Sequence, residues 1–478
     1  MKKSTGRLRC VSTNVAVAAL LSGCTTQPAA PLTNQTDREI ALPDMAQQWR
    51  QPQASDVPSR LTLEWWRSFG SAELVGLMET AQRDSTDLAL AIARVRQAQA
   101  SATIEGAPLL PAVGASLAAT QAARLGGGSD KGIIDVTGYR IGMVASYELD
   151  FWGRNAAMRD SAGALLQAAR FDLDTVRLTL TAAVASTWLQ TIGLRERVEI
   201  ARLSESNARR LLTVFEARAR AGAANAVELA QQRGVLAEQR RVRAALDQQF
   251  THSQTMLALL LGRNPSLLAP ANAESTPMQA PGIDAGVPAE LITRRPDLAR
   301  AEAQLASANA DIVAARAAML PRLTLGTNLT VGGNRVGRIF DNPLYSLAAG
   351  LTAPIFDAGR LAAGHELALA RREALLANYR GAILAAFGDV ETALNAVEGL
   401  DAQRNAQQET LKQARRALNL AEVRYRAGAE NSMTLLDAQR TLYAAQDGAA
   451  QLQTLRLQAA VSLYKALGGG WQLGPSES

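Results

Sequence analysis

Two closely related stretches decide how this 478-residue chain folds: Arg220-Ala221-Gly222-Ala223-Ala224-Asn225 and Arg426-Ala427-Gly428-Ala429-Glu430-Asn431. Gly after a helical run ends a helix, and Asn shortly afterwards begins the next, so each stretch predicts the turn of a helical hairpin. The two turns are 206 residues apart (426 minus 220), which indicates an internal duplication. Further pairs match at this offset, namely Gly153/Gly359, Arg154/Arg360, Arg218/Arg424 and Leu261/Leu467, and Leu110/Leu320 match at 210.

Proline is absent from two long parts of the chain, between Pro111 and Pro265 and between Pro354 and Pro475. Because proline inside a helix costs about 3 kcal/mol, such gaps are where long helices can form. Apolar residues recur there with helical spacing. We therefore expect helices over 154–221 and 360–427, each about 100 Å long at 1.5 Å per residue. The low aromatic content of 4% suits helices packed side by side.

Four stretches of about ten residues alternate between apolar and polar side chains. They predict strands at about 111–122, 135–150, 321–333 and 343–356, and their length suits a tilted strand that crosses a membrane. The alternative is a soluble antiparallel sheet with one wet face. Lipid cannot satisfy the edges of an open sheet, and four strands are too few to close a barrel. A membrane sheet would therefore require an oligomer, for instance three chains that share twelve strands.

The N-terminus has the form of a bacterial lipoprotein signal. Residues 1–23 join four basic residues to a short apolar stretch, and Leu21-Ser22-Gly23-Cys24 has the form of a lipobox. We expect cleavage before Cys24 and acylation of this cysteine, with an extended linker over 24–60. The alternative is an ordinary signal peptide with a chance cysteine.

Charge and composition exclude several classes of function. Without residues 1–23 the chain has 46 basic residues (50 minus 4) and 44 acidic ones, a charge of +2 with no basic stripe, so we expect no nucleic-acid partner. Only His252 and His365 and two cysteines are available, so we expect no metal site, no cofactor apart from the lipid, and no catalytic nucleophile–base set. The glycines at 126–128 precede no GK[ST] and predict a loop between strands.

Several motifs together resemble a known family, the outer membrane factors of tripartite efflux and type I secretion systems (the TolC/OprM-like proteins), in particular their lipoprotein, NodT-type branch. The motifs are Trp65-Trp66-Arg67-Ser68-Phe69, Tyr147-Glu148-Leu149-Asp150-Phe151-Trp152-Gly153-Arg154, Arg294-Arg295-Pro296-Asp297, Pro354-Ile355-Phe356-Asp357-Ala358-Gly359, Leu435-Leu436-Asp437-Ala438-Gln439-Arg440 and Ala466-Leu467-Gly468-Gly469-Gly470-Trp471.

The resemblance implies a mainly α protein with a membrane β-barrel: a homotrimer that forms one twelve-stranded barrel and a long periplasmic α-helical barrel of coiled coils. It also implies a small mixed equatorial domain. In this scheme the first repeat is 61–264, the inter-repeat and equatorial segment 265–295, the second repeat 296–473 and the C-terminal tail 474–478.

The resemblance also implies site residues at the two hairpin turns. The turns would be the periplasmic tips on which an adaptor protein docks, with Arg220, Gly222, Asn225, Arg426, Gly428 and Asn431 as the docking positions. Just beyond the second tip, Met433 and Asp437 would form an apolar and an acidic ring, and Tyr425 and Arg440 would hold neighbouring helices shut. The alternative for Asp437 and Arg440 is an ordinary surface ion pair at i, i+3 spacing.

These implications favour a passive exit channel in the outer membrane. It would export drugs or other toxic small molecules from an inner-membrane pump, of the RND type, through a periplasmic adaptor. One alternative is the exit channel of a type I polypeptide secretion system. Another is a lipid-anchored periplasmic helical scaffold without a pore.

Overall fold

The computed structural model describes residues 48–50, 62–123, 135–222, 225–267, 278 and 280–472. All of them belong to one compact unit. The predicted signal peptide, Cys24, the tail 474–478 and the glycines at 126–128 lie outside the described residues. No helix in the described part of the chain is long and apolar enough to cross a membrane.

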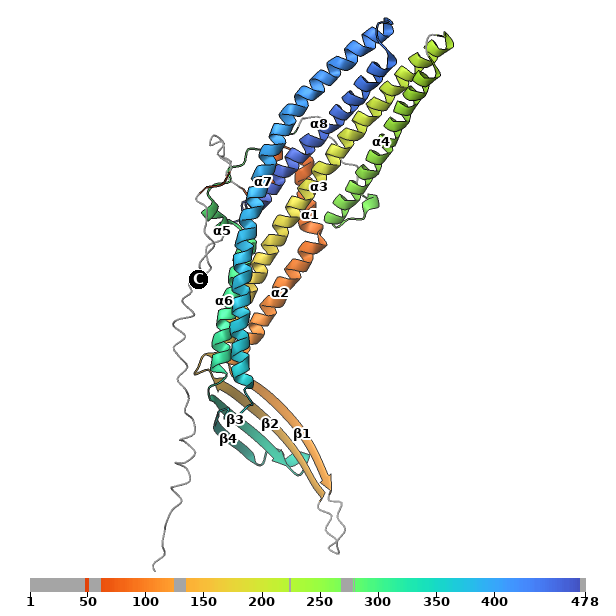
Figure 1. The fold of residues 1–478 in the computed structure, drawn as a ribbon. Coiled ribbons are helices and arrows are strands. Elements are labelled where there is room, and N and C mark those ends of the chain that lie inside the picture. Colours follow the sequence, from red (N-terminus) through yellow and green to blue (C-terminus); the bar gives the residue numbers. More distant parts are fainter. Residues whose placement is uncertain are drawn as a thin grey trace, which may run out of the picture. The chain divides into compact units, whose positions relative to one another are not determined.

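Two helical hairpins dominate the fold, and they confirm the duplication (Figure 1). The first joins α3 (Arg154–Arg220) to α4 (Ala226–Leu260), and the second joins α7 (Arg360–Arg426) to α8 (Ser432–Ala466). The long helices have 67 residues each and the short ones 35 each, so every boundary recurs at the offset of 206. At both tips the predicted glycine has a positive φ, 74° at Gly222 and 72° at Gly428, a conformation that few residues other than glycine adopt.

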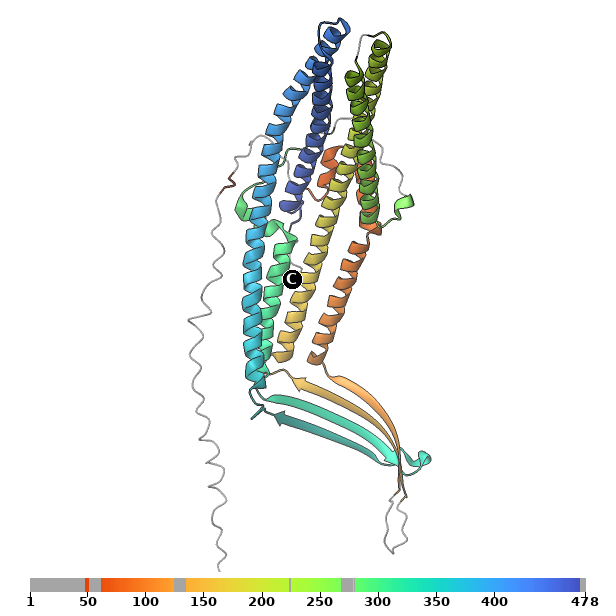
Figure 2. The ribbon, with the colours of Figure 1, turned by 45° about the vertical axis from the view of Figure 1, so that its right-hand side comes forward.

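Two further helices continue the short arms of the hairpins toward the sheet, α2 (Thr86–Gly106) and α6 (Pro296–Ala317). A third, α1 (Ala72–Asp84), precedes α2 and packs against α3. The N-terminus of α6 meets the C-terminus of α8, where Arg295 Nη1 donates to the Ala466 carbonyl at 3.3 Å. The start of α2 meets the end of α4 in the same way, since Arg263 pairs with Asp84 at 3.6 Å. Each half of the duplication thus has one continuous long helix beside one interrupted one (Figure 2).

The four predicted strands form one antiparallel sheet in the order β1-β2-β3-β4. Its strands are β1 (Ala112–Ala123), β2 (Asp135–Leu149), β3 (Arg322–Gly333) and β4 (Pro343–Thr352). The register places Leu117 opposite Ile141 and Ile141 opposite Val331, whereas Ser116, Gly142 and Thr330 lie in the adjacent cross-strand row. Because successive side chains point to opposite faces, one face of the sheet is apolar and the other is mainly polar or small.

The predicted end of the fourth strand, at residue 356, is wrong. The strand ends at Thr352, because Pro354 has no N–H to donate to the ladder and disfavours regular pairing. Ile355 and Phe356 follow as exposed residues, and Asp357 then caps the start of α7 by accepting from the Leu361 N–H at 3.0 Å.

One short element, η2 (Trp65–Phe69), packs near the middle of the helices in the largest cluster of buried apolar residues. Trp65 stacks on Tyr464 with ring centroids 5.1 Å apart, and Trp188 is buried beside α1. Trp49 lies within the predicted extended linker but is anchored, since its indole N–H donates to the Gly286 carbonyl at 2.9 Å. The short elements are η2 (Trp65–Phe69), η3 (Ala107–Leu109), η4 (Pro265–Leu267), η5 (Pro288–Glu290), α5 (Leu291–Arg294) and η6 (Val336–Arg338).

Candidate functional site: the hairpin tips and the open sheet

Both hairpin tips restart their helix with an asparagine cap. Asn225 Oδ1 accepts from the Glu228 N–H at 2.9 Å, and Glu228 Oε2 accepts in return from the Asn225 N–H at 3.2 Å, which completes a capping box. Asn431 Oδ1 accepts from the Thr434 N–H at 3.0 Å. The caps explain why Asn stands at the same place in both repeats, since each satisfies an N–H that the first helical turn leaves unpaired.

The two tips are joined to each other within one chain. Ser432, the first residue of α8, donates through its hydroxyl to Glu228 Oε1 at 3.0 Å. The Glu228 carboxylate therefore serves its own cap and the other hairpin at the same time. A link between residues 204 positions apart ties the start of α4 to the start of α8.

A second link lies one to two turns from the tips, around Tyr425. Its ring is buried and stacks on Phe215 of α3, with centroids 5.1 Å apart and planes at 22°. The Arg218 guanidinium lies 4.5 Å from the centre of the Tyr425 ring, and its Nη1 donates to the Tyr425 carbonyl at 3.1 Å. Burial raises the pKa of the Tyr425 hydroxyl, with only partial opposition from the positive charge of Arg218. Tyr425 thus holds α3 against α7 inside the protomer.

The packing between the hairpins also contains polar atoms without partners. The hydroxyls of Tyr425 and Tyr443 and both amide atoms of Gln439 are buried and have no hydrogen-bond partner among the described residues. Burial raises the pKa of Tyr443 to about 12. Each unpaired buried group lowers the stability of the fold by about 1–3 kcal/mol. This part of the core therefore contributes less stability than its buried apolar area alone suggests.

The other predicted gate residues lie on the exposed side of α8. Met433 is 60% exposed, and Asp437 and Arg440 are also exposed. In the described part of the chain no ion pair joins Asp437 to Arg440, so the i, i+3 surface pair is not formed. The structure therefore separates the predicted set, with Tyr425 inside the protomer and the other three residues available to contacts outside it.

The predicted docking residues are exposed at the two tips. Arg220 and Arg426 end the long helices, and Arg426 pairs with Glu422 at 2.5 Å. Gly222 and Gly428 make the turns, and Asn225 and Asn431 cap the returning helices. The first tip has no ion pair like that of Arg426 in its described residues, so the two tips present different charge distributions.

The sheet presents a second incomplete surface, because its outer strands have one neighbour each. The edge strands β1 and β4 each pair on one side only within the described chain. Large apolar side chains on them are open, including Leu117 at 79% and Leu347 at 78% exposure. The unpaired N–H and C=O groups of the edge strands need further strands as partners, and the open apolar face is stable only in an apolar surrounding.

Sequence reasoning missed Arg218, Glu228 and Ser432 as links between the hairpins. In the sequence Arg218 stands out only because it recurs as Arg424 in the second repeat. The equivalent residue Arg424 has a different role, since it forms an ion pair with Glu430 of its own tip at 3.4 Å. Glu228 carried a signal, the capping-box spacing after Asn225. Groups of His, Cys, Asp or Glu that could hold a metal ion are absent from the described residues.

Comparisons with known proteins agree with this geometry. The sequence profile of the outer membrane efflux protein family matches residues 77–263 and again 287–469, once for each repeat. The pyoverdine export outer membrane protein OpmQ of Pseudomonas putida is 49% identical over 89% of this chain and 92% of its own length. OpmQ of Pseudomonas aeruginosa is 47% identical over 96% of both chains.

A solved structure shares the fold as well as the sequence pattern. The outer-membrane channel OprN superposes with a TM-score of 0.84 at 27% identity, over 90% of this chain and 98% of its own. The match extends over the helices and the sheet together. The protein is therefore an outer-membrane transport component and not an enzyme, and the chain belongs to the outer membrane efflux protein family.

Proposed function

We propose that three copies of this chain form the exit channel of a tripartite efflux system in the outer membrane. The observation that carries this proposal is the four-stranded sheet, which has two unpaired edges and one apolar face on a chain of this family. Three such sheets joined edge to edge close a twelve-stranded barrel, and closure is what lipid requires of a membrane sheet.

The helical hairpins would then form a tube in the periplasm with its entrance at the tips. We propose that the tips dock on a periplasmic adaptor that connects to an inner-membrane pump of the RND type. The exposed residues Arg220, Gly222, Asn225, Arg426, Gly428 and Asn431 are the proposed contacts. Helix ends with exposed arginines and tight glycine turns suit the tip-to-tip packing of two helical hairpins.

The resting entrance would be narrowed by residues of α8. Met433 and Asp437 supply an apolar and an acidic ring when repeated by three-fold symmetry, and Arg440 supplies cations that offset the repulsion among the carboxylates. Their exposure within the protomer supports contacts between protomers. Tyr425 acts inside each protomer, where it keeps the two hairpins together.

The proposed cargo is a small molecule. The relatives OpmQ are named for pyoverdine export, which favours a small exported compound over a polypeptide, and we extend the cargo to drugs and other toxic compounds. We also propose that Cys24 carries the lipid that anchors the N-terminus in the outer membrane. Secretion of a polypeptide remains the second candidate, since the same exit channel serves that purpose in related systems.

The test has two parts. Deletion of the gene from a strain with an intact pump should raise sensitivity to several unrelated toxic compounds, and the full-length chain should restore resistance. The purified chain should conduct ions in planar lipid bilayers and run as a heat-modifiable trimer on gels. An unchanged export profile, or a protein without conductance, would instead support the periplasmic scaffold.

A further inference from the structure

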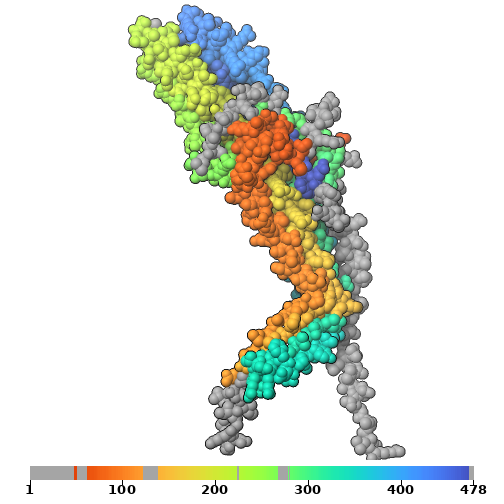
Figure 3. Space-filling model, turned by 180° about the vertical axis from the view of Figure 1, so that it is seen from behind, coloured from red at the N-terminus to blue at the C-terminus, as the bar shows by residue number. Residues whose placement is uncertain are grey.

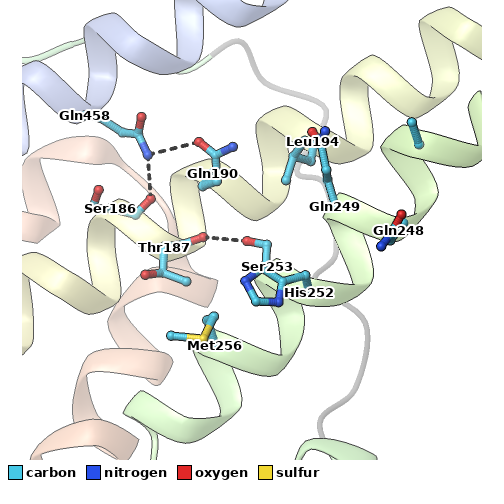
Figure 4. Close-up of a pocket in the computed structure, with 11 residues that line it drawn as sticks. Ser186, Thr187, Gln190, Leu194, Gln248, Gln249, His252, Ser253, Met256 and Gln458 are labelled. Carbon is cyan, nitrogen blue, oxygen red and sulfur yellow. Dashed lines mark hydrogen bonds between the residues drawn. The ribbon is translucent and has the colours of Figure 1, made fainter. Parts of the chain in front are cut away.

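One hollow away from the tips has an unusual chemical lining. It is about 710 Å³ in volume and lies between α3, α4 and α8 (Figure 4). No aspartate, glutamate, lysine or arginine is among the residues that line it in the described chain. Four glutamines do so, together with hydroxyl side chains, one histidine and a few apolar residues: Gln190, Gln248, Gln249, Gln458, Ser186, Thr187, Ser253, His252, Met256, Leu194 and Ala245.

Hydrogen bonds fix the orientation of two of the glutamine side chains, Gln458 and Gln190. Gln458 Nε2 donates to the Ser186 carbonyl at 3.0 Å and to Gln190 Oε1 at 3.2 Å. Since the oxygen of Gln190 accepts this bond, its amide N–H groups remain available, and so does the oxygen of Gln458. Figure 4 shows Gln248 and Gln249 on α4 across from this pair. The hollow therefore offers amide donors and acceptors from both sides without net charge.

Helical packing does not require these glutamines. At the offset of 206 the second repeat replaces Gln190 by Ala396, Gln248 by Thr454 and Gln249 by Leu455, and α7 and α8 still pair like α3 and α4. A second hollow of about 700 Å³ shares some of the corresponding positions, Thr392, Ala393 and Ala396, and its lining contains no glutamine but does contain charged side chains such as Arg295 and Asp389. Gln190, Gln248 and Gln249 are thus particular to the first repeat and not a consequence of the fold.

The hollow lies on the side of α3 that faces away from the packed segments. Trp188 of α3 is buried against α1, and Gln190 is two residues further on, roughly 200° around the helix. Figure 3, the view from behind, shows α1 lying over this opposite side of the helices. In a tube closed by three copies, α1 would obstruct the bore if it lay inside, so the bore is on the side of the hollow.

The polar face of the sheet is joined to the start of α3. Glu148 lies on the polar face of the sheet, which a lipid-embedded barrel turns toward its interior. Its carboxylate pairs with Arg154 of α3 at 3.0 Å. The start of α3 is thus tied to the side of the sheet that a lipid-embedded barrel turns toward its interior.

We infer that this glutamine-lined hollow is a contact site for cargo on the wall of the channel, and that it binds uncharged, amide- and hydroxyl-bearing molecules such as short peptides. The inference rests on the proposed function, because it needs the helical tube to be a conduit. Amide side chains bind peptide groups with hydrogen bonds in both directions and attract neither anions nor cations. The hollow is within the size range of sites for small ligands.

The experiment uses the full-length protein in planar lipid bilayers, with a blocked neutral peptide, N-acetyl-Ser-Gly-Ser-Gly-amide, as the probe. The variant Gln190→Ala, Gln248→Thr, Gln249→Leu installs the residues of the second repeat. The mean duration of probe-induced current interruptions should fall about tenfold, as expected for the loss of one to two net hydrogen bonds. Gln451→Ala, an exposed position of α8 outside the hollow, is the control and should leave the durations unchanged.

The outcomes separate this inference from the proposed function. A wild-type protein without conductance contradicts the channel itself. A conducting protein whose interruptions are absent, or equally long in the variant, overturns the cargo site alone. An acidic peptide of the same length should give durations that the variant does not alter. If the triple variant fails to conduct, the single variants Gln248→Thr and Gln249→Leu replace it, both at exposed positions, with an expected decrease of about threefold each.

Discussion

Arg218 holds Tyr425 in two ways, since its guanidinium lies 4.5 Å from the ring centre while its Nη1 donates to the Tyr425 carbonyl at 3.1 Å. The contact joins α3 of the first hairpin to α7 of the second. The equivalent arginine of the second repeat, Arg424, instead pairs with Glu430 of its own tip. The duplication therefore produced two arginines at equivalent positions, and only one of them, Arg218, joins the two hairpins.

Removal of this link should favour separation of the hairpins. Arg218→Ala loses a cation–π contact and a charged hydrogen bond. We therefore expect the ratio of open to closed dwell times in planar bilayers to rise about tenfold, which corresponds to a change of about 1.4 kcal/mol in the free-energy difference between the two states. Arg424→Ala is the matched control, because the side chain is 61% exposed and its single partner lies in the same hairpin. An equal rise in both variants would show that charge at the tip matters and the link does not.

The acidic and basic residues of α8 should act between protomers. Asp437→Ala combined with Arg440→Ala should raise the single-channel conductance, because the proposed ring of carboxylates and its proposed cations would both be removed from the entrance. Arg440→Ala alone should favour the open state more strongly, since it leaves the carboxylates to repel one another.

A matched control for this pair exists on α7. Glu409 and Lys412 have the same i, i+3 spacing and form an exposed ion pair at 3.6 Å. Glu409→Ala with Lys412→Ala should leave the conductance unchanged, because such pairs contribute only about 0.2–0.5 kcal/mol. If both double variants behave alike, Asp437 and Arg440 are ordinary surface residues.

The joints between the interrupted helices should be sensitive to any added side chain. Gly468 has a φ of 87°, and a Cβ there would collide with the Arg294 carbonyl. Gly222 has a φ of 74° at the first tip, with no atom within 4 Å of its Cβ position. Alanine in the left-handed backbone conformation lowers the stability of the fold by about 1–2 kcal/mol at either position. Only Gly468→Ala also brings a Cβ into collision with the backbone.

We therefore expect Gly468→Ala to reduce the amount of assembled protein severalfold, and to lower the temperature at which the heat-modifiable band is lost. Gly222→Ala should assemble nearly as well as the wild type. A normal yield of Gly468→Ala would mean that the joint between α8 and α6 can open without loss of the fold.

Much of this fold can be predicted from the sequence, because the duplication repeats the residues that end one helix and begin the next. Glycine and asparagine at the two tips, the proline-free gaps and the four alternating stretches fix helix ends and strands by local rules, which act in the same way in both repeats. The end of β4 was the exception. There Pro354 interrupted the ladder although the apolar alternation continued to Ile355.

The contacts between hairpins were not visible, because they depend on which faces of distant helices meet. Arg218 and Arg424 occupy equivalent positions before the two tips, and neither position shows in the sequence which residue of the other hairpin it meets. The glutamines of the hollow come from three helices, and none of their spacings is distinctive. The resemblance to a family supplied the gate positions, but it gave no reason to separate buried Tyr425 from exposed Asp437.

Tyr443 should make the stability of the helical tube depend on alkaline pH. Burial raises its pKa to about 12, above the usual value of 10. Because the folded state binds this proton more tightly than the unfolded state, the contribution of the protonated hydroxyl is complete below pH 10. It is lost as the pH rises from 10 through 12.

Tyr443→Phe should remove this dependence and also stabilise the protein at neutral pH. The buried hydroxyl has no hydrogen-bond partner among the described residues, so its removal relieves about 1 kcal/mol while the ring keeps its packing. Thermal denaturation followed by circular dichroism at pH 7 and at pH 11 measures both effects. Tyr464→Phe is the control, because the Tyr464 hydroxyl has Ser68 Oγ at 3.4 Å. That variant should be neutral or less stable at pH 7. A Tyr443→Phe variant less stable than the wild type at pH 7 would show that the hydroxyl has a partner in the assembled channel, across the interface between protomers.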